Sequence, residues 1–140
     1  NKVEMESFCN PDESFDEHLF MVASEEYLMK SLKLPYQVIE KCTADIGFPN
    51  AKGVDINTWL PGQDKYRETH TADYITDFQA RSMKTRFRRK DGKVEFVHTN
   101  DATVFSERPL VAIIENYQTK DGDVLIPEVL KKYMNEREKI

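Results

Sequence analysis

The spacing of hydrophobic and polar residues predicts strands that are interrupted by helices. Residues 2–8 and 54–60 alternate apolar and polar side chains, a period typical of strands. Residues 36–42 and 66–74 are predicted to be extended as well. The strongest hairpin signal is Asp91-Gly92, which separates the strand-like runs 85–89 and 94–99.

Four helices are predicted between and after these strands. Asn10 and Pro11 favour the start of a long helix that continues to about Lys33. Shorter helices are expected at 77–83, after the capping residue Asp77, at 108–118, and after Pro127. The run 108–118 is apolar enough for a buried strand, but its length and the early proline favour a helix. Residues 135–140 are expected to fray. The apolar stripe expected to face the core from the long helix is Phe15, Leu19, Val22, Leu28 and Leu32.

Hairpin-linked strands with helices between them predict an α+β fold, an antiparallel sheet flanked by helices. A length of 140 residues suits one domain, 1–140. With 39% hydrophobic and 32% charged residues the composition excludes a disordered chain. No apolar run reaches membrane-spanning length, so no membrane partner is expected. The net charge of -5 argues against a main nucleic-acid-binding surface.

The two cysteines, Cys9 and Cys42, are far apart and lack metal-ligand spacing. We interpret them as reduced thiols in or near the core of a cytoplasmic protein.

Six short blocks carry the most specific signal in the chain. They are WLPGQ (59–63), YRE (66–68), DFQAR (77–81), FVHT (96–99), ENYQ (115–118) and IPEVL (126–130). In this order and spacing they resemble the C-terminal part of the catalytic domain of bacterial-type seryl-tRNA synthetases, which are class II aminoacyl-tRNA synthetases. The resemblance implies a partial class II catalytic domain, from the end of motif 2 through motif 3. It places the N-terminal tRNA-binding arm and the dimer-forming motif 1 outside these residues.

The resemblance also implies a reaction and partners. Such enzymes use ATP, with Mg²⁺, to convert serine to seryl-adenylate, and then transfer the seryl group to tRNA(Ser). The parent protein is expected to be a cytoplasmic homodimer, and this chain alone is expected to be inactive. An arginine in the first strand of motif 2, which supports adenylate formation in class II enzymes, also falls outside these residues.

The expected serine-binding residues come from the end of motif 2 and from residues 99–103. Lys2-Val3-Glu4 matches the motif whose Glu contacts bound serine, and a carboxylate suits a substrate ammonium. Thr103 matches the family's serine-contacting hydroxyl, with Asn100 and Asp101 beside it. A site built to bind a hydroxyl rejects analogues without one. From the residues alone, Glu4 is an outward-facing strand residue and 99–103 is a polar turn.

The expected ATP-binding residues are Glu68, Thr69, His70, Thr71 and Arg108. The resemblance implies that Glu68 binds Mg²⁺. This ion needs only one or two protein carboxylates because it keeps several of its bound waters. Arg108 matches the motif 3 arginine, whose guanidinium can stack on adenine and face phosphate. Without the resemblance, Glu68 and Arg67 are an ordinary exposed pair, and a lone histidine is more often structural than catalytic. With the resemblance, a structural and a functional role are weighted equally for His70.

Motif 3 departs from the family pattern. Glu107 stands where the family has glycine, the segment before Arg108 is one residue short, and a carboxylate at 107 is expected to pair with the arginine and compete with ATP. This departure favours one alternative, a non-catalytic binding or dimerising module. A second alternative is a paralogue that loads an amino acid on a carrier other than tRNA. The basic run 84–90 is interpreted as a solvated hairpin face, with transient tRNA contact as the alternative.

Overall fold

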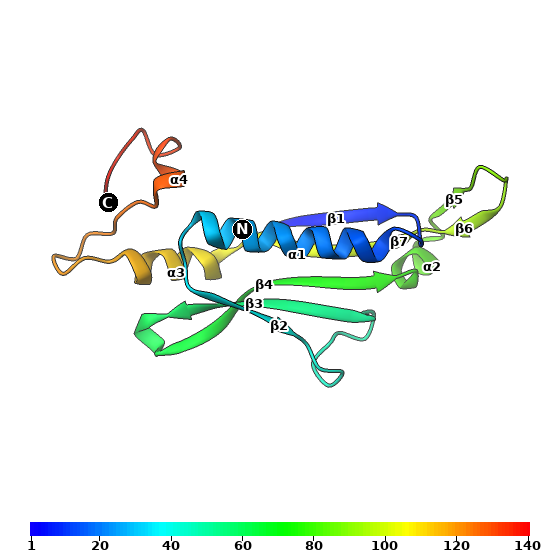
Figure 1. The fold of residues 1–140 in the computed structure, drawn as a ribbon, viewed down its shortest axis with the longest axis horizontal. Coiled ribbons are helices and arrows are strands. Elements are labelled where there is room, and N and C mark those ends of the chain that lie inside the picture. Colours follow the sequence, from blue (N-terminus) through cyan, green and yellow to red (C-terminus); the bar gives the residue numbers. More distant parts are fainter.

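The computed structural model describes all residues from 1 to 140, and a five-stranded antiparallel sheet forms its centre. The strand order is β1-β7-β4-β3-β2, and each neighbouring pair is antiparallel (Figure 1). The predicted α+β fold with an antiparallel sheet is therefore confirmed. The strands are β1 (Val3–Cys9), β2 (Tyr36–Glu40), β3 (Lys52–Leu60), β4 (Lys65–Thr76) and β7 (His98–Phe105).

The long helix α1 (Ser14–Ser31) packs over the central strands β4 and β7. It begins four residues later than predicted, after a turn in which the Glu13 amide donates to the Asn10 carbonyl. The predicted core stripe is wrong at its start, where Phe15 is 45% and Leu19 is 48% exposed, and right at its end, where Leu32 is buried and Leu28 packs against the main core. The buried residues recur every three or four positions instead, and several are polar: Ser14, His18, Met21, Glu25 and Met29.

Hydrogen bonds to the sheet explain why polar residues of α1 are buried. The Ser14 hydroxyl lies 3.2 Å from the Tyr74 hydroxyl and 2.8 Å from His98 Nδ1. His18 Nε2 lies 3.1 Å from the Ala72 carbonyl oxygen. A polar side chain that finds partners in this way can be buried at low cost. Hydrophobic spacing alone therefore missed the buried polar residues in the first half of the helix.

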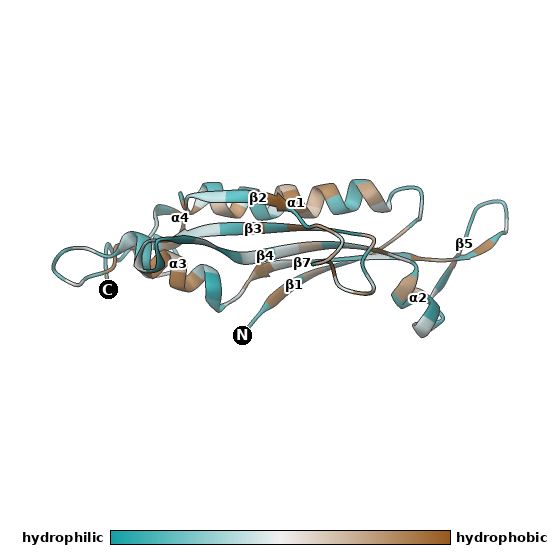
Figure 2. Ribbon diagram, turned by 90° about the horizontal axis from the view of Figure 1, so that it is seen from below, coloured by the Kyte–Doolittle hydropathy of each residue, from teal (hydrophilic) through white to brown (hydrophobic).

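The main hydrophobic core lies where the end of α1 meets β3 and the helix α3 (Glu107–Tyr117). The helix predicted at 108–118 is confirmed, and its hydrophobic turns are brown in Figure 2. Glu115 and Asn116 fix α3 to the neighbouring strand end. Glu115 accepts a hydrogen bond from the Gly62 amide (2.8 Å), within the short helix η1 (Pro61–Gln63). Asn116 Nδ2 donates to the Trp59 carbonyl (2.9 Å). The core residues are Met29, Leu32, Leu34, Ile56, Leu60, Ala112 and Ile113.

A small second sheet extends from one end of the molecule (Figure 1). It is the predicted hairpin, formed by β5 (Arg86–Arg88) and β6 (Val94–Phe96), and Gly92 has the positive φ of 90° that its turn requires. The predicted strand 94–99 is divided in two, because β7 begins at His98 and belongs to the main sheet. The helix α2 (Phe78–Met83) follows Asp77 as predicted. The Asp77 carboxylate does not cap the helix, however, and pairs with Arg81 instead.

The C-terminal segment is better ordered than expected. After α4 (Glu128–Lys131) the tail returns to pair with residues 124–126. Val124 and Ile140 exchange two backbone hydrogen bonds of 2.8 and 3.0 Å, and the Ile126 amide donates to the Glu138 carbonyl (2.9 Å). The expected fraying of 135–140 is thus wrong, because the backbone of the tail forms hydrogen bonds with the backbone of residues 124–126.

Two further features concern the cysteines and the membrane. Both cysteines are free, but only Cys9 is partly buried; Cys42 is exposed, which corrects its expected place near the core. None of the helices has both the length and the apolar character needed to span a bilayer.

We expect this chain on its own to self-associate through the edge of β1. The only neighbour of β1 is β7, so its outer edge is unpaired, and Val3 (57%) and Phe8 (59%) are exposed on it. Unpaired strand edges pair with other chains. Sedimentation velocity should show oligomers that increase with concentration, and Phe8→Lys should reduce them because a charge disfavours edge pairing. A monomer at all concentrations would show that the edge is protected.

Candidate functional site

The candidate residues occupy the face of the sheet opposite α1. Residues directly opposite each other in an antiparallel pair share a face. Asp101 is opposite both Glu6 and Asp73, while Thr103 is opposite Glu4. The intervening Ala102, with Ala72, packs under α1. Glu4, Asp101 and Thr103 therefore all project from the face opposite α1.

Thr71 lies on the same face as Thr103. It is opposite Asp55 on β3, one residue before Ala72, which faces α1. The strand alternation thus places an expected ATP-binding residue beside the expected serine-binding residues.

A hollow connects the two groups of candidates. A cavity of about 250 Å³ is bordered by Thr103, Glu68 and Arg108, together with Lys2, Thr69, Ser106 and Glu107. One of the expected serine contacts therefore shares a cavity with three of the expected ATP contacts. The cavity has no hydrophobic lining residue, which suits a polar ligand.

A second cavity is also bordered by Arg108. It has a volume of about 440 Å³, and its lining residues are Leu60, Gln63, Arg67, Glu68, Thr69, Arg108 and Val111. Arg67 Nε donates to Gln63 Oε1 at 2.9 Å, so Arg67 lines this cavity without contacting Glu68. Leu60 and Val111 supply the apolar surface that a planar base needs, next to the Arg108 guanidinium.

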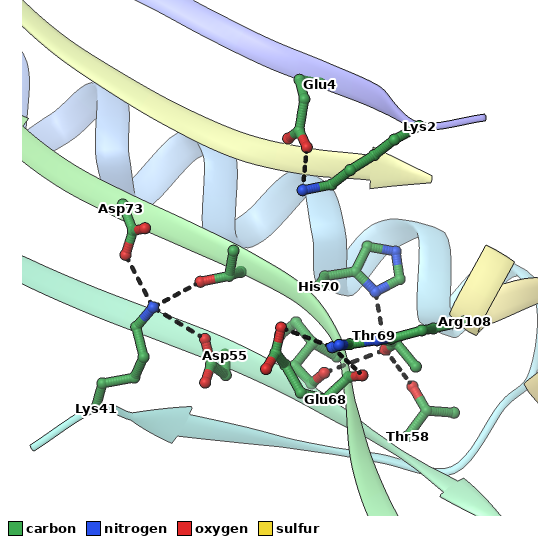
Figure 3. Close-up of polar contacts among 12 residues, drawn as sticks. Lys2, Glu4, Lys41, Asp55, Thr58, Glu68, Thr69, His70, Asp73 and Arg108 are labelled. Carbon is green, nitrogen blue, oxygen red and sulfur yellow. Dashed lines mark hydrogen bonds and ion pairs between the residues drawn. The ribbon is translucent and has the colours of Figure 1, made fainter. Parts of the chain in front are cut away.

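Arg108 and Glu68 border both cavities and contact each other (Figure 3). Arg108 Nη1 lies 3.0 Å from Glu68 Oε1 and donates to the Glu68 carbonyl oxygen at 3.2 Å. Both side chains remain accessible, at 63% and 47% exposure. A ligand that brings phosphates and a cation can therefore reach both groups from either cavity.

Glu107 does not compete with ATP for Arg108 in the way the sequence indicated. Its carboxylate is exposed and forms no ion pair with Arg108. Arg108 pairs with Glu68 instead. The difference arises at the start of α3, where consecutive residues point in different directions around the helix axis.

Substituting Glu107 should therefore have little effect on nucleotide binding. We expect Glu107→Gly to change the ATP dissociation constant of the complete protein in which this chain occurs by less than about twofold, since Glu107 is exposed and forms no ion pair with Arg108. Isothermal titration with ATP measures it. A change of tenfold or more would mean that Glu107 does act on Arg108.

Two expected site residues lie apart from this cluster. Asn100 is fully buried on the α1 side of β7, and its Nδ2 donates to the Ser14 carbonyl at 3.0 Å. His70 is opposite Ile56, which also faces α1, and its Nδ1 lies 2.9 Å from Thr69 Oγ1. Burial lowers the pKa of His70 to about 4, so the ring is neutral at pH 7. The two-residue period of the strands sends both side chains into the interior.

Thr69 is used internally as well as lining both cavities. Its hydroxyl donates to the Ile56 carbonyl at 3.1 Å and lies 2.7 Å from Thr58 Oγ1 (Figure 3). The extra residue in β4 at this point produces a register shift between Ile56 and Asn57 of β3. Such a bulge redirects side chains at functional sites, and here it separates the exposed Glu68 from the buried Thr69.

The face opposite α1 is strongly acidic. Burial, followed by the charges of Asp73, Glu6 and Glu4, raises the pKa of Asp101 to about 6. The Glu4 carboxylate pairs with Lys2. A cationic group entering beside Asp101 and Glu4 would meet two carboxylates on adjacent strands, which suits an ammonium.

The residues present fit Mg²⁺ only as a partial ligand set. No three carboxylate, histidine or cysteine side chains converge on one point. Glu68 offers a half-exposed carboxylate that borders both cavities. One carboxylate with phosphate oxygens and waters is nevertheless an ordinary Mg²⁺ environment.

The sequence reasoning missed Lys41, which contributes a cation to this face from just beyond β2. The available signal was the presence of acids in three central strands, Asp55, Asp73 and Asp101. Acids are depleted in strands, so three in adjacent strands indicate a compensating charge or a ligand.

Comparisons with known proteins agree with this geometry. The core-domain model of class II tRNA synthetases for G, H, P, S and T matches residues 1–117. Serine–tRNA ligase from Thermodesulfovibrio yellowstonii is 50% identical over 136 residues, 96% of this chain and 32% of the relative. The serine–tRNA ligase from Nitratidesulfovibrio vulgaris is also 50% identical, over 99% of this chain and 33% of its own length. The chain thus spans about a third of the curated relatives that it matches.

Solved structures show the same fold. Seryl-tRNA synthetase from Pyrococcus horikoshii, complexed with ATP, superposes with a TM-score of 0.94 at 43% identity, over 99% of this chain and 31% of that one. Cytoplasmic serine–tRNA ligase from Naegleria fowleri, in complex with AMP, gives 0.91 at 32% identity, over 99% of this chain and 33% of its own. The strand order, the superposition on solved seryl-tRNA synthetases and the match over residues 1–117 lead to one conclusion: the chain belongs to the class II tRNA synthetase core-domain family.

Proposed function

We propose that residues 1–140 are the C-terminal part of the catalytic domain of a serine–tRNA ligase. The observation that carries the proposal is the cavity that Thr103 shares with Glu68 and Arg108. In this cavity, the residue expected to bind the serine hydroxyl lies beside the groups expected to bind the nucleotide. The identity of about 50% to serine–tRNA ligases supports serine as the amino acid.

In this proposal the sheet face binds serine. Glu4 and Asp101 hold the substrate ammonium, because both carboxylates project from adjacent strands on the face opposite α1. Thr103 hydrogen-bonds the serine hydroxyl. An amino acid without that hydroxyl would leave a buried polar group unpaired, which costs enough to exclude it.

Arg108 and Glu68 bind the nucleotide. The guanidinium stacks on the base or faces the phosphates, and Glu68 gives Mg²⁺ its one protein carboxylate. The ion, when bound, offsets charge on the phosphates. Since Arg108 and Glu68 pair with each other without ligand, each must exchange that partner for one on the nucleotide. The two charges are thereby kept in place before ATP enters.

The remaining partners follow from the relatives. We propose that the complete protein charges tRNA(Ser), acts as a homodimer and works in the cytoplasm, where charged tRNA is consumed. The conversion of serine and ATP to seryl-adenylate puts extra negative charge on the α-phosphate, which needs positive groups placed in advance. Arg108 is the candidate within these residues.

Serine-dependent ATP–pyrophosphate exchange by the complete protein in which this chain occurs tests the proposal. We expect exchange with serine and at least a hundredfold less with alanine, since the hydroxyl is bound by Thr103. Exchange followed by charging of tRNA(Ser) is the full expected result. Exchange without charging would identify a paralogue that loads another carrier. Absence of both exchange and ATP binding would identify a non-catalytic module.

A further inference from the structure

One buried cation on the substrate face has no role in the site as described so far. Lys41 follows β2, and its Nζ lies 2.8 Å from Thr71 Oγ1, 3.0 Å from Asp73 Oδ1 and 3.3 Å from Asp55 Oδ1 (Figure 3). Its side chain is only 10% exposed. A buried lysine is uncommon unless it is paired, and here three oxygens from β3 and β4 surround the ammonium.

The neighbouring strand is shaped to admit this side chain. The side chain of Lys41 passes directly over Gly53, which has no side chain of its own. A Cβ atom at position 53 would lie 2.2 Å from Lys41 Cε and 2.7 Å from Asp73 Oδ1. Any other residue at 53 would therefore displace the lysine or the aspartate. Glycine in a strand often marks such a close approach.

The hydrogen bond from Lys41 fixes the direction of the Thr71 hydroxyl. An ammonium can only donate, so Thr71 Oγ1 must accept. This is the one hydrogen bond that the hydroxyl makes within the chain, and its own proton remains free for another acceptor. Thr71 thus offers a donor on the face that carries Thr103 and Asp101, where a ligand oxygen can accept it.

The same ammonium balances the charge of the surrounding carboxylates. Asp55 Oδ1 and Asp73 Oδ1 are buried and accept no directed hydrogen bond, so the nearby charge of Lys41 is their main compensation. Burial lowers the pKa of Lys41, but contacts with Asp73 and Asp55 outweigh it and raise the pKa above its ordinary value. The lysine therefore stays charged at neutral pH.

We propose that Lys41 is a positioning residue of the substrate site: its ammonium sets the Thr71 hydroxyl as a hydrogen-bond donor to an oxygen of the bound nucleotide. The proposal rests on the serine–tRNA ligase function above. Lys41 touches no reacting atom, and its effect on the ligand passes through Thr71. Its effect should therefore depend on whether residue 71 carries a hydroxyl.

The test is a double-mutant cycle in the complete protein, with serine-dependent exchange as the assay. The variants are Lys41→Met, Thr71→Val, both together, and Thr71→Ser with and without Lys41→Met. We expect Lys41→Met to raise the KM for ATP about tenfold, the cost of one charge-assisted hydrogen bond, with little change in kcat. In the Thr71→Val protein the same change should add less than about twofold, because no hydroxyl remains to orient. Thr71→Ser keeps the hydroxyl and should restore the full sensitivity.

Each other outcome overturns a different statement. An equal loss of kcat in every background, with KM unchanged, would mean that Lys41 only stabilises the fold, and would overturn the positioning role. If Lys41→Met fails to fold, Lys41→Met with Asp73→Asn removes one unbalanced carboxylate and carries the same cycle. No serine-dependent exchange in the unaltered protein would remove the proposed function, and with it this role. Exchange in the unaltered protein with no effect of Lys41→Met would remove the role alone.

Discussion

Serine-dependent ATP–pyrophosphate exchange is expected to fall by at least about a hundredfold when Arg108 is replaced with alanine in the complete protein. Removing one preorganised charge from a site of this kind typically costs that much. Arg108 borders both cavities and forms the only ion pair of Glu68 (3.0 Å). Its loss removes a contact to the nucleotide and leaves Glu68 facing the phosphates without compensation. Steady-state exchange at several ATP concentrations gives kcat and KM separately.

Two matched variants separate the position of the charge from its presence. Arg108→Lys keeps the charge but not the planar, forked guanidinium, and we expect an intermediate loss. Arg88→Ala makes the same chemical change on the β5–β6 hairpin, where Arg88 donates only to the Gly92 carbonyl, and should leave exchange unchanged. Exchange by Arg108→Ala within threefold of the unaltered protein would contradict the assigned site.

The second large effect concerns stability and the buried Glu25 of α1. This residue has no exposed surface, and neither of its carboxylate oxygens has a hydrogen-bond partner. Burial, reinforced by the charge of Asp55, raises the pKa of Glu25 from 4.5 to about 8. The folded protein therefore binds a proton that the unfolded chain releases above pH 4.5. The stabilisation is complete below pH 4.5 and is lost as the pH rises to about 8.

Glu25→Gln should consequently be the more stable protein at neutral and alkaline pH. One pKa unit corresponds to about 1.4 kcal/mol, so the glutamine variant should gain about 3 kcal/mol over the unaltered chain at pH 7 and more at pH 8. Near pH 4.5 the unaltered chain and the variant should have the same free energy of unfolding, apart from the small effect of replacing the hydroxyl of the protonated carboxyl group with an amide. Urea unfolding of the 140-residue chain at pH 4.5, 6, 7 and 8 measures the difference.

Comparison between the two proteins is essential because His70 titrates in the opposite sense. Its lowered pKa, about 4, means that folding favours the neutral ring, so its contribution is lost as the pH falls from 6.5. This term is common to both proteins and cancels in the difference. Asp16→Asn, an exposed acid on the same helix, should show no such gain. A free-energy difference that does not change with pH would mean that Glu25 is ionised in the folded protein.

Several elements could be predicted from the sequence because short-range chemistry determines them. The Asp91-Gly92 turn requires the positive φ that Gly92 adopts. The alternation of residues 2–8 placed Glu4 and Glu6 on one face of β1, which is where they lie. Pro109 and the length of its run favoured a helix, and α3 is observed. Each of these features depends on a few neighbouring residues.

What could not be predicted depends on partners distant in sequence. The buried face of α1 is set by hydrogen bonds from Ser14 and His18 to β4 and β7, which no hydrophobic spacing reveals. The inward position of Asn100 depends on the register of β7. Lys41 reaches the site only because Gly53, on the neighbouring strand, leaves room for it.

For the candidate site, the sequence predicted which residues take part better than it predicted their contacts with one another. The resemblance of motif blocks selected Glu4, Thr103, Glu68 and Arg108, and the structure places them around one face and one cavity. The internal use of the Thr69 hydroxyl and the pairing of Arg108 with Glu68 instead of Glu107 required coordinates. Which side chains remain free to meet a ligand is therefore a tertiary property.

The central claim is tested most directly by calorimetry. The measurement is the binding of a nonhydrolysable seryl-adenylate analogue to the complete protein, with the alanyl analogue as control. The account predicts binding of the seryl analogue at least a hundredfold tighter than that of the alanyl analogue, and loss of this preference in Thr103→Val, which lacks the hydroxyl. Equal binding of the two analogues, or binding of neither, would contradict the assignment of this sheet face as a serine and ATP site.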